Sequence, residues 1–355
     1  MRVAVLGLGH MGAPIAERLE QAGHELSVWN RSPAAAEPFV RRGITGLERP
    51  RAAWQHAEVA ITMLADDAAV QAVALGEGGL LGDPGPRGES PPGEASSRPP
   101  GESVGEASRG AAAGTRALID MSTISVAASA EIAAAAAREH VAYLRAPVSG
   151  NPSVVVAGKL GIIVSGPPEV FERLAPTLRD VGPSLYHVGD GEQARIVKLA
   201  LNLMIGGTTQ LLAEALVLAE RHGLQRRQLL EVVAGSAIGS PYVSYKQGTL
   251  LSGDYTSTFT ARLLHKDLGL ALAAGHAAAV PLPVTALVQQ LVEDCIAQGM
   301  GDLDLAVLVP RLEREAGGVG AQPAGSSPAQ PEDDHGTQPD GDATTQPEND
   351  HGAQP

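Results

Sequence analysis

The chain opens with residues 1–33, MRVAVLGLGHMGAPIAERLEQAGHELSVWNRSP, and this stretch decides the fold. An apolar run, Val3–Leu8, leads into the turn Gly7-Leu8-Gly9-His10-Met11-Gly12, and a helical stretch, Pro14–Ala22, follows it. In such a unit the first glycine permits the tight turn, the second lets the backbone approach a pyrophosphate, and the third lets helix and strand pack closely. The N-terminus of the helix offers unpaired N–H groups to the phosphates. We therefore predict that these six residues bind a dinucleotide.

The pattern of strand and helix continues outward from this unit. Further strand-like runs alternate with helical stretches such as Val126–His140, and they are Leu26–Asn30, Val59–Leu64, Ala117–Met121, Val141–Leu144, Gly161–Val164 and Leu185–Val188. This alternation predicts an α/β class with a parallel, doubly wound sheet, that is, a Rossmann domain over residues 1–190. Residues 191–315 have helical periodicity, broken at Gly223, 239–241, Gly253 and 281–283. They predict an all-α C-terminal domain that begins with a long interdomain helix.

Two segments differ in composition from the rest of the chain. Residues 82–116 contain six Pro and eight Gly, and residues 316–355 contain six Pro, seven Gly and the near-repeat QPEDDHGTQP/QPENDHGAQP. Neither segment can bury enough apolar surface to offset its ordering entropy, so we expect a disordered insertion and a disordered tail. The tail holds seven acidic side chains and no Lys or Arg, which is half of the net charge of −14.

Charge and cysteine content exclude several classes of protein. The remaining charge of −7 argues against a generally basic nucleic-acid binder. Cys295 is the only cysteine, so no intramolecular disulfide forms and a reducing cytoplasm fits. Residues 1–9 lack the features of a signal peptide, and Pro281 and Pro283 interrupt the uncharged stretch 268–288. We expect a cytoplasmic protein with no membrane partner and no metal site, with His335 and His351 of the tail solvated.

The end of the second strand bears on the choice of dinucleotide. An acidic residue there would accept hydrogen bonds from the ribose 2′-OH of NAD. This chain has Asn30-Arg31-Ser32 instead, and the arginine fork with the serine hydroxyl suits a 2′-phosphate. A solvated surface arginine is the alternative reading of Arg31. We predict that NADP is preferred and that NAD is possible.

The sequence resembles a known family of enzymes. Residues 7–33 are similar to the opening of the β-hydroxyacid dehydrogenases, which include 3-hydroxyisobutyrate dehydrogenase, tartronate semialdehyde reductase and the glyoxylate/succinic semialdehyde reductases. Later motifs follow in the family's order, and they are Ile119–Ser125, Ala146–Gly150, Lys198 with Asn202, Lys266–Leu268 and Val280–Pro283. The resemblance covers residues 1–81 and 117–315. It implies an oxidoreductase that transfers hydride between NADP(H) and a short hydroxy acid, semialdehyde or 2-oxo acid.

The resemblance also implies roles for single residues. Lys198 would be the catalytic acid/base and Asn202 its partner; they are four apart, so on a helix they share one face. An ammonium can donate a proton to a carbonyl oxygen while hydride reaches the carbon. The expected binders of the substrate carboxylate are Ser122, Ser149, Gly150 and Asn151. The expected further cofactor contacts are Met63, Leu64, Thr123 and Lys266, although Met63 and Leu64 also suit plain core and Ser149 an ordinary turn.

The chain departs from the family pattern at Arg145, Asn151, Ala65 and Leu201, which leaves the substrate open. Arg145 replaces an acidic residue and is a candidate partner for the substrate carboxylate. Imine reductases share the architecture but usually have Asp or Tyr in place of Lys198. A 6-phosphogluconate-type enzyme would need a larger C-terminal domain, and a silent coenzyme-binding scaffold would not need Lys198. The Ala-rich, apolar helices favour a homodimer or homotetramer.

Overall fold

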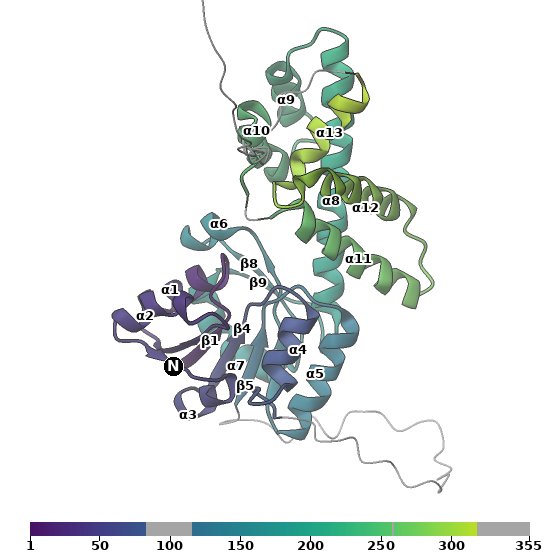
Figure 1. Cartoon of the computed structure of the whole chain (residues 1–355). Helices are drawn as coiled ribbons and strands as arrows, with labels where there is room; N and C mark the ends of the chain where they lie inside the picture. The colour runs from purple at the N-terminus through teal and green to yellow at the C-terminus, as the bar shows by residue number, and fades with distance from the viewer. Residues whose placement is uncertain (83–115, 258, 318–355) are drawn as a thin grey trace, which may run out of the picture. The chain divides into compact units, whose positions relative to one another are not determined.

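The computed structural model describes residues 1–82, 116–257 and 259–317. The predicted disordered insertion, 82–116, and the predicted disordered tail, 316–355, lie almost entirely outside these residues. Within the described residues, the larger sheet has six parallel strands in the order β3-β2-β1-β4-β5-β6. Figure 1 labels β1, β4 and β5 of this sheet. These strands are β1 (Arg2–Leu6), β2 (Glu25–Trp29), β3 (Thr45–Gly46), β4 (Val59–Thr62), β5 (Ala117–Asp120) and β6 (Ala142–Arg145).

Helices cover both faces of this sheet because its strands are apolar on both sides. Val3 and Val5 of β1 join one buried cluster, whereas Ala4 and Leu6 join another, as the alternation of side chains along a strand requires. The first cluster packs against α1 (Gly12–Gln21) and α7 (Pro168–Val181), and the second against α4 (Asp67–Leu75) and α5 (Val126–Arg138). Short helices complete this part, and they are α2 (Glu37–Arg41), α3 (Ala53–His56) and α6 (Pro152–Val156). The predicted doubly wound sheet is confirmed.

The last two predicted strands belong to a second sheet and not to the first. This sheet has the order β7-β8-β9, with β7 (Val148–Ser149) antiparallel to β8 (Gly161–Val164) and β8 parallel to β9 (Ser184–His187). Pro147 lies between β6 and β7. Because proline has no N–H to donate, it ends the pairing of β6, and the chain leaves the first sheet there.

Helices α8 to α13 follow, and they are α8 (Gln193–Arg221), α9 (Arg226–Gly235), α10 (Pro241–Ser252), α11 (Ala261–Ala277), α12 (Pro283–Cys295) and α13 (Leu308–Glu315). They surround one buried apolar cluster, which includes Cys295. Three predicted breaks recur as helix ends: Pro241 and Pro283 open α10 and α12, and Gly253 ends α10 with φ of +70°. The all-helical C-terminal part is confirmed, while the boundary at residue 190 stays a prediction because all described residues lie in one compact unit.

Helix α8 is long and apolar enough to cross a membrane by length and composition alone. Core helices of soluble proteins have the same property, so this observation is weak, and the cytoplasmic location stays a prediction.

Candidate active site

The glycine turn between β1 and α1 has the close packing that its sequence predicts. Gly7 has φ of +99°, and a Cβ atom there would lie 2.3 Å from the carbonyl oxygen of Met63. A Cβ on Gly12 would lie 1.8 Å from the carbonyl oxygen of Gly7. Side chains at these two positions would therefore collide with backbone, so the turn, β4 and the start of α1 pack as closely as they do only with glycine.

Gly9 differs from its two neighbours because a Cβ added there would meet nothing within 4 Å. Its small size is therefore not needed for packing within the described protein, and it leaves bare backbone facing open space beside the N-terminus of α1. A dinucleotide pyrophosphate requires such a surface, so the residues present fit the predicted coenzyme. His10 is exposed, Met11 is half-buried, and the side chain of Leu8 is buried in the sheet core.

Asn30 supports the glycine turn from the end of β2. Its Oδ1 accepts a hydrogen bond of 2.9 Å from the Leu8 N–H, and its Nδ2 donates one of 3.0 Å to the Ser32 carbonyl oxygen. The side chain of Asn30 is therefore occupied in fixing two backbone segments. Arg31 and Ser32, which follow it, are exposed at the same edge of the sheet. The two groups predicted to meet a 2′-phosphate are thus accessible to a ligand.

The loops after β4 and β5 are joined at Ser122. The Leu64 N–H donates a hydrogen bond of 2.9 Å to Ser122 Oγ, and the Ser122 N–H donates one of 3.1 Å to Asp120 Oδ1. Ser122 is completely buried, whereas Met63, Leu64 and Thr123 are half-buried. The Ser122 oxygen serves as an acceptor within the protein, and the side chain has no exposed surface.

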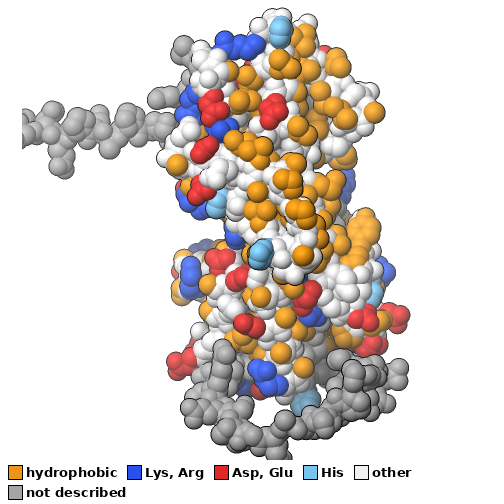
Figure 2. Space-filling model, turned by 90° about the vertical axis from the view of Figure 1, so that its right-hand side faces the viewer, with side chains coloured by type: hydrophobic (Ala, Val, Ile, Leu, Met, Phe, Trp, Pro, Cys, Tyr) orange, Lys and Arg blue, Asp and Glu red, His pale blue; other side chains and the backbone are white. Residues whose placement is uncertain are grey.

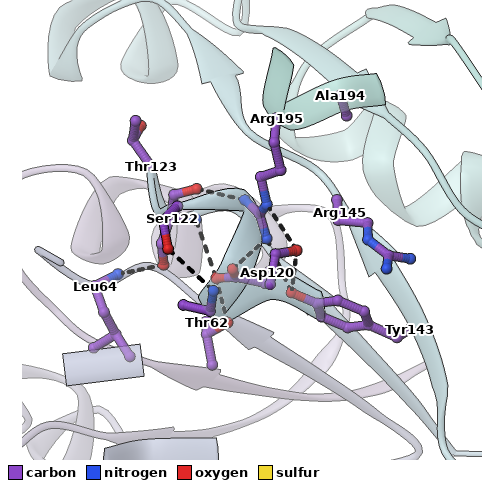
Figure 3. A network of polar contacts seen from close by, with 12 residues as sticks. Thr62, Leu64, Asp120, Ser122, Thr123, Tyr143, Arg145, Ala194 and Arg195 are labelled. Atoms are coloured by element: carbon purple, nitrogen blue, oxygen red, sulfur yellow. Dashed lines mark hydrogen bonds and ion pairs between the residues drawn. The ribbon is translucent and has the colours of Figure 1, made fainter. Parts of the chain in front are cut away.

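A buried ion pair contacts the backbone of Ser122, and the sequence alone did not predict it. Arg195 Nη2 lies 2.5 Å from Asp120 Oδ2, and the two residues are 1% and 0% exposed (Figure 3). One signal was present in the sequence: Arg195 lies four residues before the buried Leu199, so the two share one face of α8. An arginine on such a face requires a buried acceptor.

Lys198 lies one turn further along α8, with Asn202 one turn beyond it. Burial lowers the pKa of the Lys198 ammonium below its ordinary value; the Asp267 carboxylate acts against this shift, and the charge of Lys266 adds to it. The Asn202 Nδ2 donates a hydrogen bond of 2.6 Å to Asp267 Oδ2, while Asn202 Oδ1 is buried without a donor among the described residues. An amine with a lowered pKa and an unpaired carbonyl oxygen therefore lie on neighbouring turns of one helix.

Lys266 bridges α11 and the loop after β5. Its Nζ donates a hydrogen bond of 2.7 Å to the Thr123 carbonyl oxygen and lies 3.0 Å from Asp267 Oδ1. The structure thus brings two predicted cofactor contacts, Lys266 and Thr123, together. Asp267, which the sequence indicated only as part of the motif Lys266–Leu268, thus contacts Lys266, and its charge also acts on Lys198.

The turn after β7 contains the remaining predicted substrate contacts, Ser149, Gly150 and Asn151. Ser149 and Gly150 are exposed, and Gly150 has φ of +143°, a conformation that favours glycine. Asn151 Oδ1 accepts a hydrogen bond of 3.0 Å from the Val154 N–H and one of 2.7 Å from the Ser153 hydroxyl. The Asn151 side chain therefore caps α6, and its oxygen is occupied within the protein.

Arg145, the candidate partner for a substrate carboxylate, already has a partner inside the protein. Its Nε donates a hydrogen bond of 2.8 Å to Glu192 Oε1, its Nη2 contacts the same oxygen, and the guanidinium lies over the Tyr143 ring. Arg145 is 8% exposed. Glu192, just before α8, therefore neutralises the residue that replaces the family's acidic one. No group of three or more His, Cys, Asp or Glu suited to a metal occurs among the described residues.

Comparison with known proteins assigns both parts of the chain. Residues 2–86 and 102–189 match the family described as "NAD binding domain of 6-phosphogluconate dehydrogenase". Residues 192–312 match the family described as "NAD-binding of NADP-dependent 3-hydroxyisobutyrate dehydrogenase".

Individual relatives span nearly the whole chain. An uncharacterized oxidoreductase of Bacillus subtilis is 36% identical, over 87% of this chain and 99% of its own length. The 3-hydroxyisobutyrate dehydrogenase of Pseudomonas aeruginosa is 33% identical, over 81% and 90%. Among solved structures, the Mycobacterium tuberculosis 3-hydroxyisobutyrate dehydrogenase with L-serine is 27% identical, with a TM-score of 0.71 over 88% of this chain and 99% of that one. The chain therefore belongs to the NAD(P)-dependent β-hydroxyacid dehydrogenases, the family of 3-hydroxyisobutyrate dehydrogenase.

Proposed function

We propose that this enzyme interconverts a short hydroxy acid with its semialdehyde or 2-oxo acid, prefers NADP(H), and uses Lys198 as its general acid and base. The observation that carries the proposal is the environment of Lys198. Burial lowers the pKa of its ammonium, and an unpaired amide oxygen, Asn202 Oδ1, lies one helical turn away. A group that transfers protons near neutral pH needs a pKa closer to that range than that of an ordinary lysine.

Lys198 performs the proton transfer in both directions. The bound coenzyme supplies or accepts the hydride at the substrate carbon. In reduction the Lys198 ammonium donates a proton to the carbonyl oxygen and stabilises the negative charge that develops there. In oxidation the neutral amine takes the hydroxyl proton. Asn202 Oδ1 accepts a hydrogen bond from the substrate hydroxyl or from the Lys198 ammonium, and the bond from Asn202 to Asp267 holds that oxygen in place.

The coenzyme site consists of the glycine turn and the residues after β2. The open space beside Gly9 supports a pyrophosphate position there. The exposed Arg31 and Ser32 support a 2′-phosphate and hence NADP, with the Asn30 side chain acting as a brace for the turn. Met63, Leu64 and Thr123 line the same edge, and Lys266 reaches it from α11.

The substrate carboxylate is bound by hydrogen-bond donors and without an arginine. The exposed turn at Ser149 and Gly150 offers a hydroxyl and backbone N–H groups. Ser122, whose oxygen accepts from the Leu64 N–H, donates its hydroxyl hydrogen to a carboxylate that enters beside it. We assign no such role to Arg145, because its Nε and Nη2 pair with Glu192. Asn151 contributes through its backbone, since its side-chain oxygen caps α6.

An assembly of two or four copies is supported by apolar side chains on the helices. Met204, Leu211 and Leu218 recur every seven residues along α8, so they form one stripe, and they are 63%, 67% and 63% exposed. Val284 and Leu287 of α12 are also exposed. Figure 2 shows hydrophobic side chains gathered on the upper part of one face, which the C-terminal helices form. We propose a homodimer or homotetramer that covers these side chains.

One assay tests this function directly. The purified chain is mixed with NADPH or NADH and with glyoxylate, succinic semialdehyde, methylmalonate semialdehyde, tartronate semialdehyde or cyclic imines, and coenzyme oxidation is followed by absorbance. We expect turnover with at least one of the acids and a higher kcat/KM with NADPH. Imine reductases share this fold at 22% identity, and turnover of imines alone would reject our proposal. Lack of turnover with every compound would favour a silent scaffold.

A further inference from the structure

Arg195 uses all of its guanidinium nitrogens inside the protein. Nη2 contacts Asp120 Oδ2 and donates a hydrogen bond of 3.0 Å to the Tyr143 hydroxyl, Nη1 donates one of 2.6 Å to the Ser122 carbonyl oxygen, and Nε donates one of 3.2 Å to Ser129 Oγ. Figure 3 shows the guanidinium reaching from α8 into this group of polar side chains. One side chain thus joins the first turn of α8 to β5, β6 and α5.

Asp120 completes the connection from the other side. Its Oδ1 accepts hydrogen bonds from the Thr62 hydroxyl at 2.8 Å and from the Ser122 N–H at 3.1 Å, while its Oδ2 faces Arg195. The Ser122 backbone is therefore held at both ends, by Asp120 at its N–H and by Arg195 at its carbonyl oxygen. The carboxylate links the ends of β4 and β5 to α8.

The position of this pair along α8 connects it to the proposed chemistry. Arg195 precedes Lys198 by three residues, so the two side chains are neighbours on the helix surface. The ion pair therefore fixes α8 against the sheet within one turn of the proposed acid/base. It also fixes Ser122, a proposed substrate contact, from the same guanidinium. The Arg195 guanidinium therefore holds both the helix that carries the proposed acid/base and the backbone of a proposed substrate contact.

We propose that Arg195 and Asp120 are a positioning pair, which holds the Lys198 amine at its working distance from Ser122 and the end of β5. This inference rests on the proposed role of Lys198. Buried ion pairs add little net stability compared with apolar residues of similar volume, but they impose a geometry. Neither residue is among the proposed contacts of substrate or coenzyme. Their effect on rate comes through the placement of Lys198, where an error of about 1 Å lowers the rate on the order of 100-fold.

The chain contains a matched control in its helical part. Lys246 Nζ lies 2.8 Å and 2.6 Å from the two oxygens of Asp304, and these residues are 3% and 2% exposed. This pair is about as buried as the pair of Arg195 and Asp120, but neither of its members forms a hydrogen bond or ion pair with Lys198, Asn202 or Ser122. Loss of a buried ion pair as such is therefore separable from loss of the positioning of Lys198.

The experiment compares two double variants, Asp120→Asn with Arg195→Met and Asp304→Asn with Lys246→Met. Each removes both charges together, so no buried charge is left unpaired, and circular dichroism checks that each variant is folded before its kcat is measured. We expect the first variant to lose about 100-fold in kcat while NADPH affinity, measured by fluorescence titration, is unchanged. The control should keep its kcat even where its melting temperature falls. A first variant with wild-type kcat, or one in which NADPH affinity falls as far as kcat, would overturn the inference.

A third variant and a second readout separate this inference from the proposed function. Arg195→Lys keeps the charge, but one ammonium cannot span Ser122, Ser129 and Tyr143, so the melting temperature should recover more than kcat; full recovery of kcat would contradict the positioning role. Amide hydrogen exchange in residues 193–199 requires no turnover. It should accelerate in the Asp120–Arg195 variant and not in the control, and equal exchange in both would refute the inference even if no hydroxy acid is a substrate.

Discussion

The Asn202 amide donates a hydrogen bond of 2.6 Å to the Asp267 carboxylate, and this bond joins α8 to α11 beside Lys198. Asp267 also lies 3.0 Å from Lys266 Nζ. The charge of Asp267 therefore acts on two lysines and one amide. Since burial lowers the pKa of Lys198 and Asp267 raises it, the carboxylate sets how far that pKa falls.

We expect Lys198→Ala to reduce kcat by about 10²–10⁴-fold, because a positioned proton donor contributes that much to such reactions. Coenzyme affinity should be unchanged, since the glycine turn and Arg31 do not involve this side chain. Stopped-flow measurement of NADPH oxidation and a fluorescence titration of NADPH test the two statements. Full turnover by the variant would remove Lys198 from the mechanism.

The pH profile of hydroxy acid oxidation should report Lys198. The neutral amine is the active form in this direction, so kcat/KM rises with pH through the pKa of Lys198, which lies below the value of about 10.4 for an ordinary lysine. Asp267→Asn removes the influence that raises this pKa, and the rise should therefore move to lower pH. A shift to higher pH, or none, would show that Asp267 does not act on Lys198 by its charge.

The glycines of the coenzyme turn should respond differently to alanine. Gly9→Ala should keep the wild-type melting temperature, because the added Cβ meets no protein atom within 4 Å. It should weaken NADPH binding, because the methyl group would occupy the space proposed for the pyrophosphate. Gly12→Ala should lower stability by about 1–3 kcal/mol, since its Cβ would collide with the Gly7 carbonyl and the backbone must shift. Thermal unfolding with and without NADPH distinguishes the two. Equal losses of stability would contradict this assignment.

Arg31→Ala should change the choice of coenzyme. Hydrogen bonds to a charged group contribute about 1.5–3 kcal/mol, so KM for NADPH should rise roughly 10- to 100-fold while KM for NADH stays constant. Arg41 is also exposed but lies on α2, where its ion partner is Glu37, and Arg41→Ala is the matched control. If KM for NADPH and KM for NADH rise equally, Arg31 does not bind the 2′-phosphate.

Arg145→Ala should affect stability and not substrate binding. The change leaves Glu192 partly buried without its partner, and removing one member of a buried pair costs about 3 kcal/mol or more. KM for an acidic substrate should be unchanged in the folded fraction. Arg145→Met combined with Glu192→Gln should restore most of the lost melting temperature. If only KM for acidic substrates increased, Arg145 would be shown to bind the substrate carboxylate.

Several features followed from the sequence because they depend on neighbours along the chain. The glycine spacing at 7–12 requires a tight turn, the uninterrupted apolar run in β1 requires a sheet covered on both faces, and Pro241, Gly253 and Pro283 mark helix ends. Lys198 and Asn202 share a helix face by their spacing alone. The family followed from the same motifs.

Only the tertiary structure decided which side chains meet across long separations. Nothing local distinguishes Arg145, which pairs with Glu192, from Arg195, which pairs with Asp120, or from Arg31, which is exposed. The same holds for β8 and β9, whose apolar runs fit either sheet until Pro147 ends the pairing of β6. Hydrophobic period and turn chemistry act over a few residues, whereas a buried charge is satisfied by whichever acceptor the packed chain brings within about 3 Å. The sequence by itself determined the fold class and the reaction family; the folded chain decided which charged side chains are exposed to a ligand and which pair with one another inside the protein.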